Sequence, residues 1–315
     1  MSKPQKILLT GSTGFIGRKL CERLVQSEQV CLTLALRHSD AEHPNAHVLG
    51  EFTGEAEWSA AVTGVDVVIH CAARAHVLKE HVANPLGSFR ETNTAGTLAL
   101  ARQAAAKGVK RFIFLSSIGV NGKASTQPFT ANDTPAPAEP YAVSKLEAEQ
   151  GLWEIQRETG MEVVVIRPPL VYGPDAPGNF GLLMGIVSKG LPLPLADTNN
   201  SRSFVSVWNL VDLIAICIDH PKAAGQLFLV RDGQDVSTSD LLREIGKAQG
   251  TPARLFWLPA PLLKAGAILL RKHSMYERLF DSLQVDDTGT RQQLDWTPPM
   301  PLDEGLRRCF ETQGH

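Results

Sequence analysis

Residues 6–26 read KILLTGSTGFIGRKLCERLVQ and set the expected architecture. A short apolar run, Lys6–Thr10, leads into glycines at positions 11, 14 and 17, and the composition then becomes that of a helix. Strand, glycine turn and helix form the context in which a backbone approaches a pyrophosphate at the positive end of a helix. The G-x-x-G-x-x-G spacing alone is weak evidence. In this position it favours a dinucleotide-binding loop over an ordinary tight turn.

The alternation of strand and helix continues to residue 167. We expect strands at Lys6–Thr10, Val30–Leu36, Asp66–Ala73, Arg111–Leu115 and Glu162–Arg167, and long helices at Pro85–Lys107 and Tyr141–Thr159. This order predicts an α/β fold with a Rossmann-type, doubly wound parallel sheet. Beyond Pro168 the pattern loosens into turns, short helices and short strands, which predicts a smaller C-terminal α/β substrate-binding region. The expected domains are residues 1–170 and 171–315, with the chain crossing between them.

The residue that ends the second expected strand bears on the choice of dinucleotide. Arg37 stands there, followed by His38 and Ser39, and no acidic residue appears before Asp40. An acidic residue would bind the ribose 2′-hydroxyl of NAD, whereas an arginine can receive the 2′-phosphate of NADP. The sequence therefore favours NADP(H), with NAD(H) as the alternative. The simpler interpretation is that Arg37 is a solvated charge at the end of a strand.

A tyrosine and a lysine share one face of an expected helix. The run that begins Tyr141-Ala142-Val143-Ser144-Lys145 has no Gly or Pro up to Gln150 and should be helical. Positions i and i+4 lie on the same face, so the phenol and the ammonium point the same way. A nearby cation favours the phenolate and lowers the tyrosine pKa from about 10 toward the range of a general acid or base. By itself this pairing is more often an accident of composition.

A serine pair follows the expected strand Arg111–Leu115. Ser116 and Ser117 stand at its carboxyl end, and ligands bind at the carboxyl ends of the strands in open parallel sheets. The alternative is that the serines only form a turn or cap a helix.

Composition excludes several other classes of protein. The 315 residues include 31 basic and 33 acidic side chains, a net charge of -2, which does not favour binding to nucleic acid. The N-terminus has no signal-peptide layout and no apolar run is long enough to span a bilayer, so we expect a cytoplasmic protein without membrane contact. Five cysteines without C-x-x-C spacing indicate reduced thiols and no metal site.

With these residues in view, nearly the whole sequence resembles the extended short-chain dehydrogenase/reductase family, in particular its nucleotide-sugar branch. Gly11, Gly14 and Gly17 match the phosphate loop of that family. The catalytic Ser/Thr-Tyr-Lys triad is matched by Ser117, Tyr141 and Lys145. The resemblance implies that the tyrosine is the general acid/base, that the serine hydrogen-bonds the reacting oxygen, and that the lysine lowers the tyrosine pKa and holds the nicotinamide ribose.

The same resemblance extends to further binding residues. The expected cofactor-binding residues are Gly11, Thr13, Gly14, Phe15, Ile16, Gly17, Arg37, Ala72, Ala73, Asn93, Tyr141, Lys145 and Pro168. The expected substrate-binding residues are His76, Ser117, Asn179 and Arg202, with Arg202 matching an arginine that binds nucleotide phosphate. His76 is more often a packing histidine than a ligand-binding one. Family members are often homodimers built on two long helices, here Pro85–Lys107 and Tyr141–Thr159.

Three functions remain in competition. The favoured one is NADPH-dependent reduction of a UDP-4-keto-6-deoxy-N-acetylhexosamine for surface polysaccharide synthesis, because of Arg37. The second is a UDP-sugar 4-epimerase that retains NAD. The third is a non-catalytic, NADP-sensing regulator, against which the intact triad argues. A dehydratase is disfavoured because Ile118 and Gly119, which cannot move a proton, stand where that branch has Asp-Glu.

Overall fold

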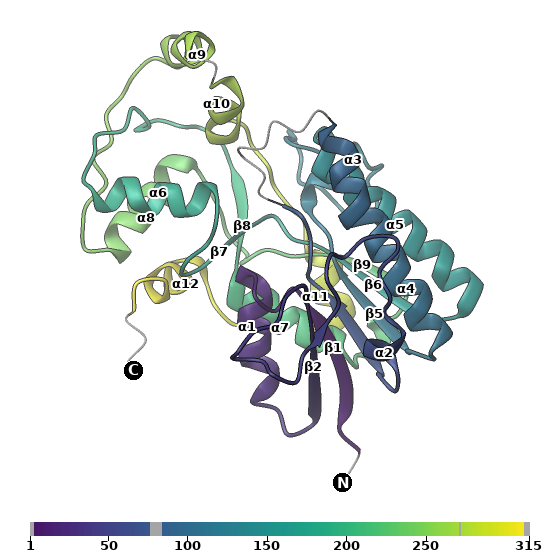
Figure 1. Cartoon of the computed structure of the whole chain (residues 1–315). Helices are drawn as coiled ribbons and strands as arrows, with labels where there is room; N and C mark the ends of the chain where they lie inside the picture. The colour runs from purple at the N-terminus through teal and green to yellow at the C-terminus, as the bar shows by residue number, and fades with distance from the viewer. Residues whose placement is uncertain (1–2, 76–83, 271, 312–315) are drawn as a thin grey trace.

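The computed structural model describes residues 3–75, 84–270 and 272–311 (Figure 1). Its larger sheet has seven strands in the order β3-β2-β1-β4-β5-β6-β9, and every neighbouring pair is parallel. The strands are β1 (Gln5–Thr10), β2 (Val30–Leu36), β3 (His47–Val48), β4 (Val67–His70), β5 (Arg111–Leu115), β6 (Glu162–Arg167) and β9 (Gln226–Leu229). The predicted Rossmann-type parallel sheet is confirmed, although β4 is shorter than the expected Asp66–Ala73.

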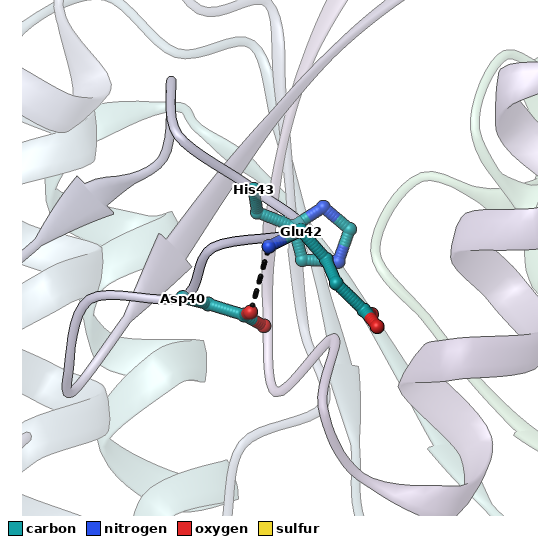
Figure 2. A group of neighbouring side chains, drawn as sticks. All are labelled: Asp40, Glu42 and His43. Carbon is teal, nitrogen blue, oxygen red and sulfur yellow. Dashed lines mark hydrogen bonds between the residues drawn. The ribbon is translucent and has the colours of Figure 1, made fainter.

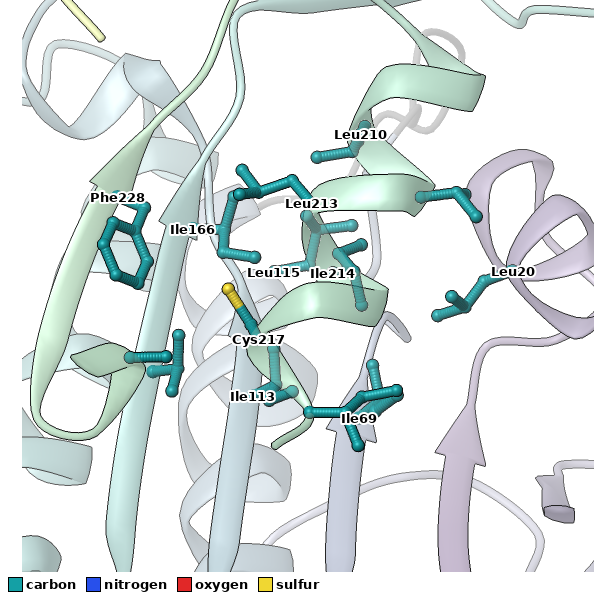
Figure 3. Close-up of a cluster of buried hydrophobic side chains, with 14 of the residues drawn as sticks. Leu20, Ile69, Ile113, Leu115, Ile166, Leu210, Leu213, Ile214, Cys217 and Phe228 are labelled. Atoms are coloured by element: carbon teal, nitrogen blue, oxygen red, sulfur yellow. The ribbon is translucent and has the colours of Figure 1, made fainter. Parts of the chain in front are cut away.

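Helices cover both faces of this sheet. They are α1 (Phe15–Val25), α2 (Ser59–Val62), α4 (Thr97–Ala106), α5 (Pro140–Thr159), α7 (Val207–Cys217) and α11 (Thr288–Leu294). Figure 3 shows one face, where Leu20 of α1 and Leu213 of α7 pack with Ile113 of β5. On the other face Phe112 packs with side chains of α4 and α5. Because successive strand residues point to opposite faces and both faces are covered, the central strands carry consecutive apolar residues between their ends.

The helix expected at Pro85–Lys107 is broken. The structure has α3 (Pro85–Phe89), a π-helical turn η1 (Arg90–Gly96) and then α4. The break coincides with two contacts to distant parts of the chain: Thr94 Oγ1 donates to the Ser144 carbonyl at 2.9 Å, and Gly96 lies against the Phe52 carbonyl, where a Cβ would overlap. Widened turns of this kind are frequent at functional sites, and η1 carries Asn93.

A second, mixed sheet of three strands supports the smaller region, in the order β10-β8-β7. These strands are β7 (Leu170–Tyr172), β8 (Arg202–Ser206) and β10 (Asp235–Val236). The region also holds α6 (Asn179–Ser188), α8 (Thr238–Ala248), α9 (Ala260–Leu269), α10 (His273–Phe280) and α12 (Leu302–Arg308). Although α7 and β9 follow residue 170 in the sequence, β9 is a strand of the larger sheet and α7 packs on one face of that sheet. The chain therefore crosses back from the smaller region to the larger sheet. A boundary at residue 170 stays a prediction. Among the described helices, none has the length and hydropathy to cross a membrane.

Candidate active site

The glycine loop brings the backbone of β1 close to that of the segment after β4. Gly11 has φ +77°, and a Cβ on it would lie 2.6 Å from the Ala72 amide nitrogen. A Cβ on Gly17 would overlap the Gly11 carbonyl, and Gly14 is the N-cap of α1. No side chain caps the start of α1, and Gly11, Thr13 and Gly14 line a cleft. This is the arrangement that binds a pyrophosphate.

A cleft of about 520 Å³ brings together six of the thirteen predicted cofactor residues. It is lined by Gly11, Thr13, Gly14, Arg37, Ala72 and Ala73, and also by residues that were not predicted, among them Ser39, Phe52, Arg74 and Thr92. Arg37 is exposed at its rim, 3.7 Å from Glu51. The residues present fit a dinucleotide, because small residues form the floor and a helix N-terminus opens into the cleft.

Three predicted cofactor residues have packing or backbone roles outside this cleft lining. Phe15 packs between the core of the larger sheet and the core of the smaller region, and Ile16 packs in the former. The Pro168 carbonyl accepts a hydrogen bond from the Ile118 amide at 2.9 Å. Their contact with a cofactor stays a prediction.

Asn93 connects the cleft to the helix that carries the tyrosine. Its Oδ1 accepts from the Arg74 amide at 2.8 Å, and its Nδ2 donates to the Arg74 carbonyl at 3.1 Å and to Ser144 Oγ at 3.0 Å. Ser144 Oγ in turn donates to the Tyr141 carbonyl at 2.7 Å. The buried amide thus fixes the loop after β4 relative to the start of α5.

A buried histidine continues this connection beneath the cleft. His70 Nδ1 lies 2.7 Å from Thr10 Oγ1 and Nε2 lies 3.0 Å from Thr97 Oγ1. Thr97 uses its proton on the Asn93 carbonyl, so it accepts from Nε2; Thr10 therefore donates to Nδ1. The imidazole is neutral with its proton on Nε2, and burial lowers its pKa to about 3. His70 is a structural link in this structure.

Lys145 and Tyr141 lie at the carboxyl end of β5, but their charges are not arranged as the sequence argument predicted. Lys145 Nζ donates to the Leu115 carbonyl at 2.8 Å and lies 4.3 Å from the centre of the Phe114 ring. Burial lowers the Lys145 pKa to about 8 and raises the Tyr141 pKa to about 12. The expected lowering of the tyrosine pKa is absent because loss of solvent around the phenol disfavours the phenolate.

Ser117 lies between β5 and the turn η2 (Ile118–Val120), half-buried. Its Oγ accepts from the Gly119 amide at 3.1 Å, which leaves the hydroxyl proton for another acceptor. Ser117 can therefore cap the turn and also hydrogen-bond a substrate oxygen, because the cap uses only a lone pair of its Oγ.

A buried polar network joins the elements that carry Ser117, Tyr141 and Lys145. The sequence did not predict this network. The Glu149 carboxylate, one turn after Lys145 on α5, accepts hydrogen bonds from Arg167 Nε at 3.0 Å and from Arg167 Nη2 at 2.5 Å. Ser116 Oγ also donates to Glu149, and Arg167 Nη1 donates to Asn121 Oδ1 at 2.8 Å. The network ties the ends of β5 and β6 to α5. The spacing of Glu149 after Lys145 was the available signal, but nothing in it identified Arg167.

The predicted substrate residues are only partly brought together. Arg202 begins β8, and its Nη1 donates to the Asp281 carbonyl at 2.8 Å. Burial and the nearby charge of Arg278 lower its pKa. Arg278, which was not predicted, pairs with Glu139 at 3.0 Å. Asn179 is the first residue of α6, and His76 lies outside the described residues.

A group of possible metal ligands lies on the loop after β2 (Figure 2). Ligand atoms of Asp40, Glu42 and His43 are within 4.8 Å of one another, and the Glu42 amide donates to Asp40 Oδ1 at 3.0 Å. That hydrogen bond already explains the placement of Asp40. We assign no metal to these exposed and half-buried groups.

Comparisons with known proteins agree with this geometry. A family model described as the NAD dependent epimerase/dehydratase family matches residues 7–230. The chain is 46% identical over 314 residues to a UDP-glucose 4-epimerase of Vibrio cholerae, covering 98% of this chain and 95% of the relative. It is 30% identical to a UDP-glucose 4-epimerase of Mycolicibacterium smegmatis, covering 97% of each chain.

Solved structures show the same fold. A UDP-glucose 4-epimerase of Thermotoga maritima, solved with UDP-glucose, superposes with a TM-score of 0.76 at 22% identity, over 97% of each chain. A UDP-glucuronic acid 4-epimerase of Bacillus cereus, solved with NAD, gives a TM-score of 0.78 at 20% identity, over 96% of this chain and 95% of that one.

Proposed function

The chain belongs to the NAD dependent epimerase/dehydratase family, and on this premise we propose that it epimerises C4 of a UDP-linked hexose with a retained NAD. One observation carries the proposal. In a chain 46% identical to a UDP-glucose 4-epimerase over 98% of its length, the cleft has a glycine floor that fits a dinucleotide, and Asn93 connects the loop after β4 to α5, the helix that carries Tyr141 and Lys145. This reverses the preference for a reductase that Arg37 alone suggested.

The residues divide the work by their chemistry. When bound, the nicotinamide supplies the hydride acceptor and donor. Tyr141 moves the proton at the sugar O4 oxygen, and the free hydroxyl proton of Ser117 holds that oxygen in place. Lys145 donates to the ribose and supplies a positive charge below its lowered pKa of about 8.

We assign the binding of the substrate diphosphate to the smaller region. Arg202 begins β8 and lies near Arg278 of α10, so two guanidinium groups face one area. Guanidinium groups bind phosphate oxygens in a planar, bidentate geometry. We place the UDP diphosphate between them, with Asn179 as a further substrate-side residue.

The test combines cofactor content with turnover. We expect the purified protein to release NAD on denaturation and to interconvert UDP-glucose and UDP-galactose without added cofactor. Tyr141→Phe should retain its NAD and lose roughly 10²–10⁴-fold in kcat. Bound NAD without C4 inversion of UDP-glucose or UDP-N-acetylglucosamine would reject the epimerase.

A second candidate is NADPH-dependent reduction of a UDP-4-keto sugar, and Arg37 favours it. The guanidinium lines the rim of the cleft where a 2′-phosphate would lie, and its partner there, Glu51, is exposed. The reductase predicts an empty site that binds NADPH reversibly and consumes it with a UDP-4-keto-6-deoxy-N-acetylhexosamine. Retained NAD argues for the epimerase, since that cycle regenerates its cofactor. The homodimer expected from α4 and α5 stays a prediction.

A further inference from the structure

Helix α9 and its flanking segment form an apolar surface that the fold does not cover. Figure 1 places α9 and α10 at the outer end of the smaller region, beyond α6 and α8. Eight of the large apolar side chains that the structure shows as exposed come from this one segment: Phe256, Trp257, Leu258, Leu262, Ile268, Leu269, Leu270 and Met275. Such a concentration marks an interaction site, because single exposed apolar residues are normal but contiguous ones are not.

The outward face of α9 is the unusual part. A surface helix normally turns polar side chains to water, yet α9 exposes Leu262 (60%) and Leu269 (83%), seven positions apart on one face. Its inner face is only half-buried, at Leu263, Gly266 and Ala267. No residue of α9 belongs to a hydrophobic core among the described parts of the chain. Apart from Lys264, the side chains of α9 are apolar, and the exposed ones would be covered by an apolar environment outside the fold.

The charge of this segment indicates what that environment is. Residues 256–275 contain three Lys or Arg and no Asp or Glu, although the whole chain has 31 basic and 33 acidic residues. Lys264 and Lys272 are exposed, and neither forms an ion pair with a residue that the structure describes. Exposed, unpaired cations beside an apolar surface are attracted to anionic headgroups, so the charge of this segment favours the surface of an anionic membrane.

We propose that residues 256–275 dock the protein on an anionic membrane surface, with the apolar face of α9 among the acyl chains and Lys264 and Lys272 at the headgroups. A second copy fits less well, because two such faces would bring the same cations together. The surface adjoins the proposed sugar site, since α10 follows α9 and carries Arg278, which pairs with Glu139 at the start of α5. Docking would therefore turn the substrate side toward the membrane. This reverses the expectation of no membrane contact drawn from composition.

The experiment is sedimentation of the full-length protein with vesicles of phosphatidylcholine, alone or with phosphatidylglycerol. We expect wild type to sediment with the vesicles that contain phosphatidylglycerol. The variant Leu262→Glu/Leu269→Glu should bind roughly a hundredfold more weakly or worse, because two exposed apolar groups no longer enter the acyl region. The matched control is Val25→Glu, which changes an equally exposed apolar residue (65%) at the end of α1 and should bind as wild type does.

A second variant tests the charges. Lys264→Glu/Lys272→Glu should lose roughly fivefold or more per residue on the anionic vesicles only. The proposal falls if wild type stays in the supernatant with both vesicles, or if Leu262→Glu/Leu269→Glu binds as Val25→Glu does. It also falls if light scattering shows that the leucine substitutions convert an oligomer to a monomer, because the face then binds a second copy. None of these readouts depends on turnover, so they are independent of the proposed epimerase activity.

Discussion

Replacing Arg167 by methionine should damage both the fold and the site. The Arg167 and Glu149 side chains are only 4% and 2% exposed and are joined by two hydrogen bonds, at 3.0 and 2.5 Å. Methionine fills a similar volume but leaves the Glu149 carboxylate buried with Ser116 as its remaining side-chain donor. Breaking a buried ion pair from one side costs about 3–5 kcal/mol. We expect a melting temperature lower by on the order of 10 °C.

A double-mutant cycle separates the pair from its surroundings. Glu149→Gln alone leaves the Arg167 cation without a charged partner, and the double variant removes both charges. The double variant should therefore be more stable than the sum of the two single effects predicts, by roughly 0.5–3 kcal/mol. Thermal unfolding followed by circular dichroism measures each corner of the cycle.

The matched control lies at the other end of the same strands. Arg111 and Glu162 pair at 2.6 Å across the first residues of β5 and β6, but Glu162 is 44% exposed. Glu162→Gln should cost roughly 1 kcal/mol or less and leave kcat unchanged, because it is far from the carboxyl ends of the strands. Arg167→Met should lower kcat at a temperature where it is still folded. If Arg167→Met costs less than about 1 kcal/mol and adds to Glu149→Gln without coupling, the network does not hold the site.

Three further predictions concern the cofactor cleft. Gly11→Ala should abolish bound cofactor, because its Cβ would meet the Ala72 amide at 2.6 Å, whereas Gly50→Ala has a similar φ of +72° with open space around it and should retain cofactor. Arg37→Asp should reduce the ratio of NADP to NAD affinity by about tenfold, measured by titration calorimetry; an unchanged ratio makes Arg37 a surface charge. kcat/KM should fall as pH rises above about 8, where Lys145 loses its proton; Lys145→Met should lack this decline, and a decline that persists assigns it to another group.

The sequence predicted those features that depend on local pattern. Apolar strands that alternate with helices require a sheet covered on both faces. The positions of β1, β2, β4, β5 and β6 along the sequence could therefore be predicted from composition and turn residues. The glycine loop was recognisable because only glycine fits where two backbones approach closely. The break at η1 was not predictable, because it depends on contacts of Thr94 and Gly96 with residues distant in sequence.

The two arginines near the candidate site that were not predicted share one physical property. Arg167 and Arg278 are placed by partners far away in the chain, Glu149 and Glu139. Neither position has a periodic or motif signal, and an arginine at the end of a strand or within a short helix reads as a solvated charge. Pairing across the fold decides their role, and a single sequence does not contain that information.

The pKa values of Tyr141 and Lys145 also show that a matching catalytic motif does not by itself fix the protonation states of its residues. In this structure burial separates their pKa values, with Tyr141 raised to about 12 and Lys145 lowered to about 8. At neutral pH the phenol therefore keeps its proton and the lysine is mostly charged. If Tyr141 is the proposed base, its phenolate must be stabilised by more than the lysine alone. A bound oxidised nicotinamide would add a positive charge, which would lower the Tyr141 pKa and populate the phenolate closer to neutral pH.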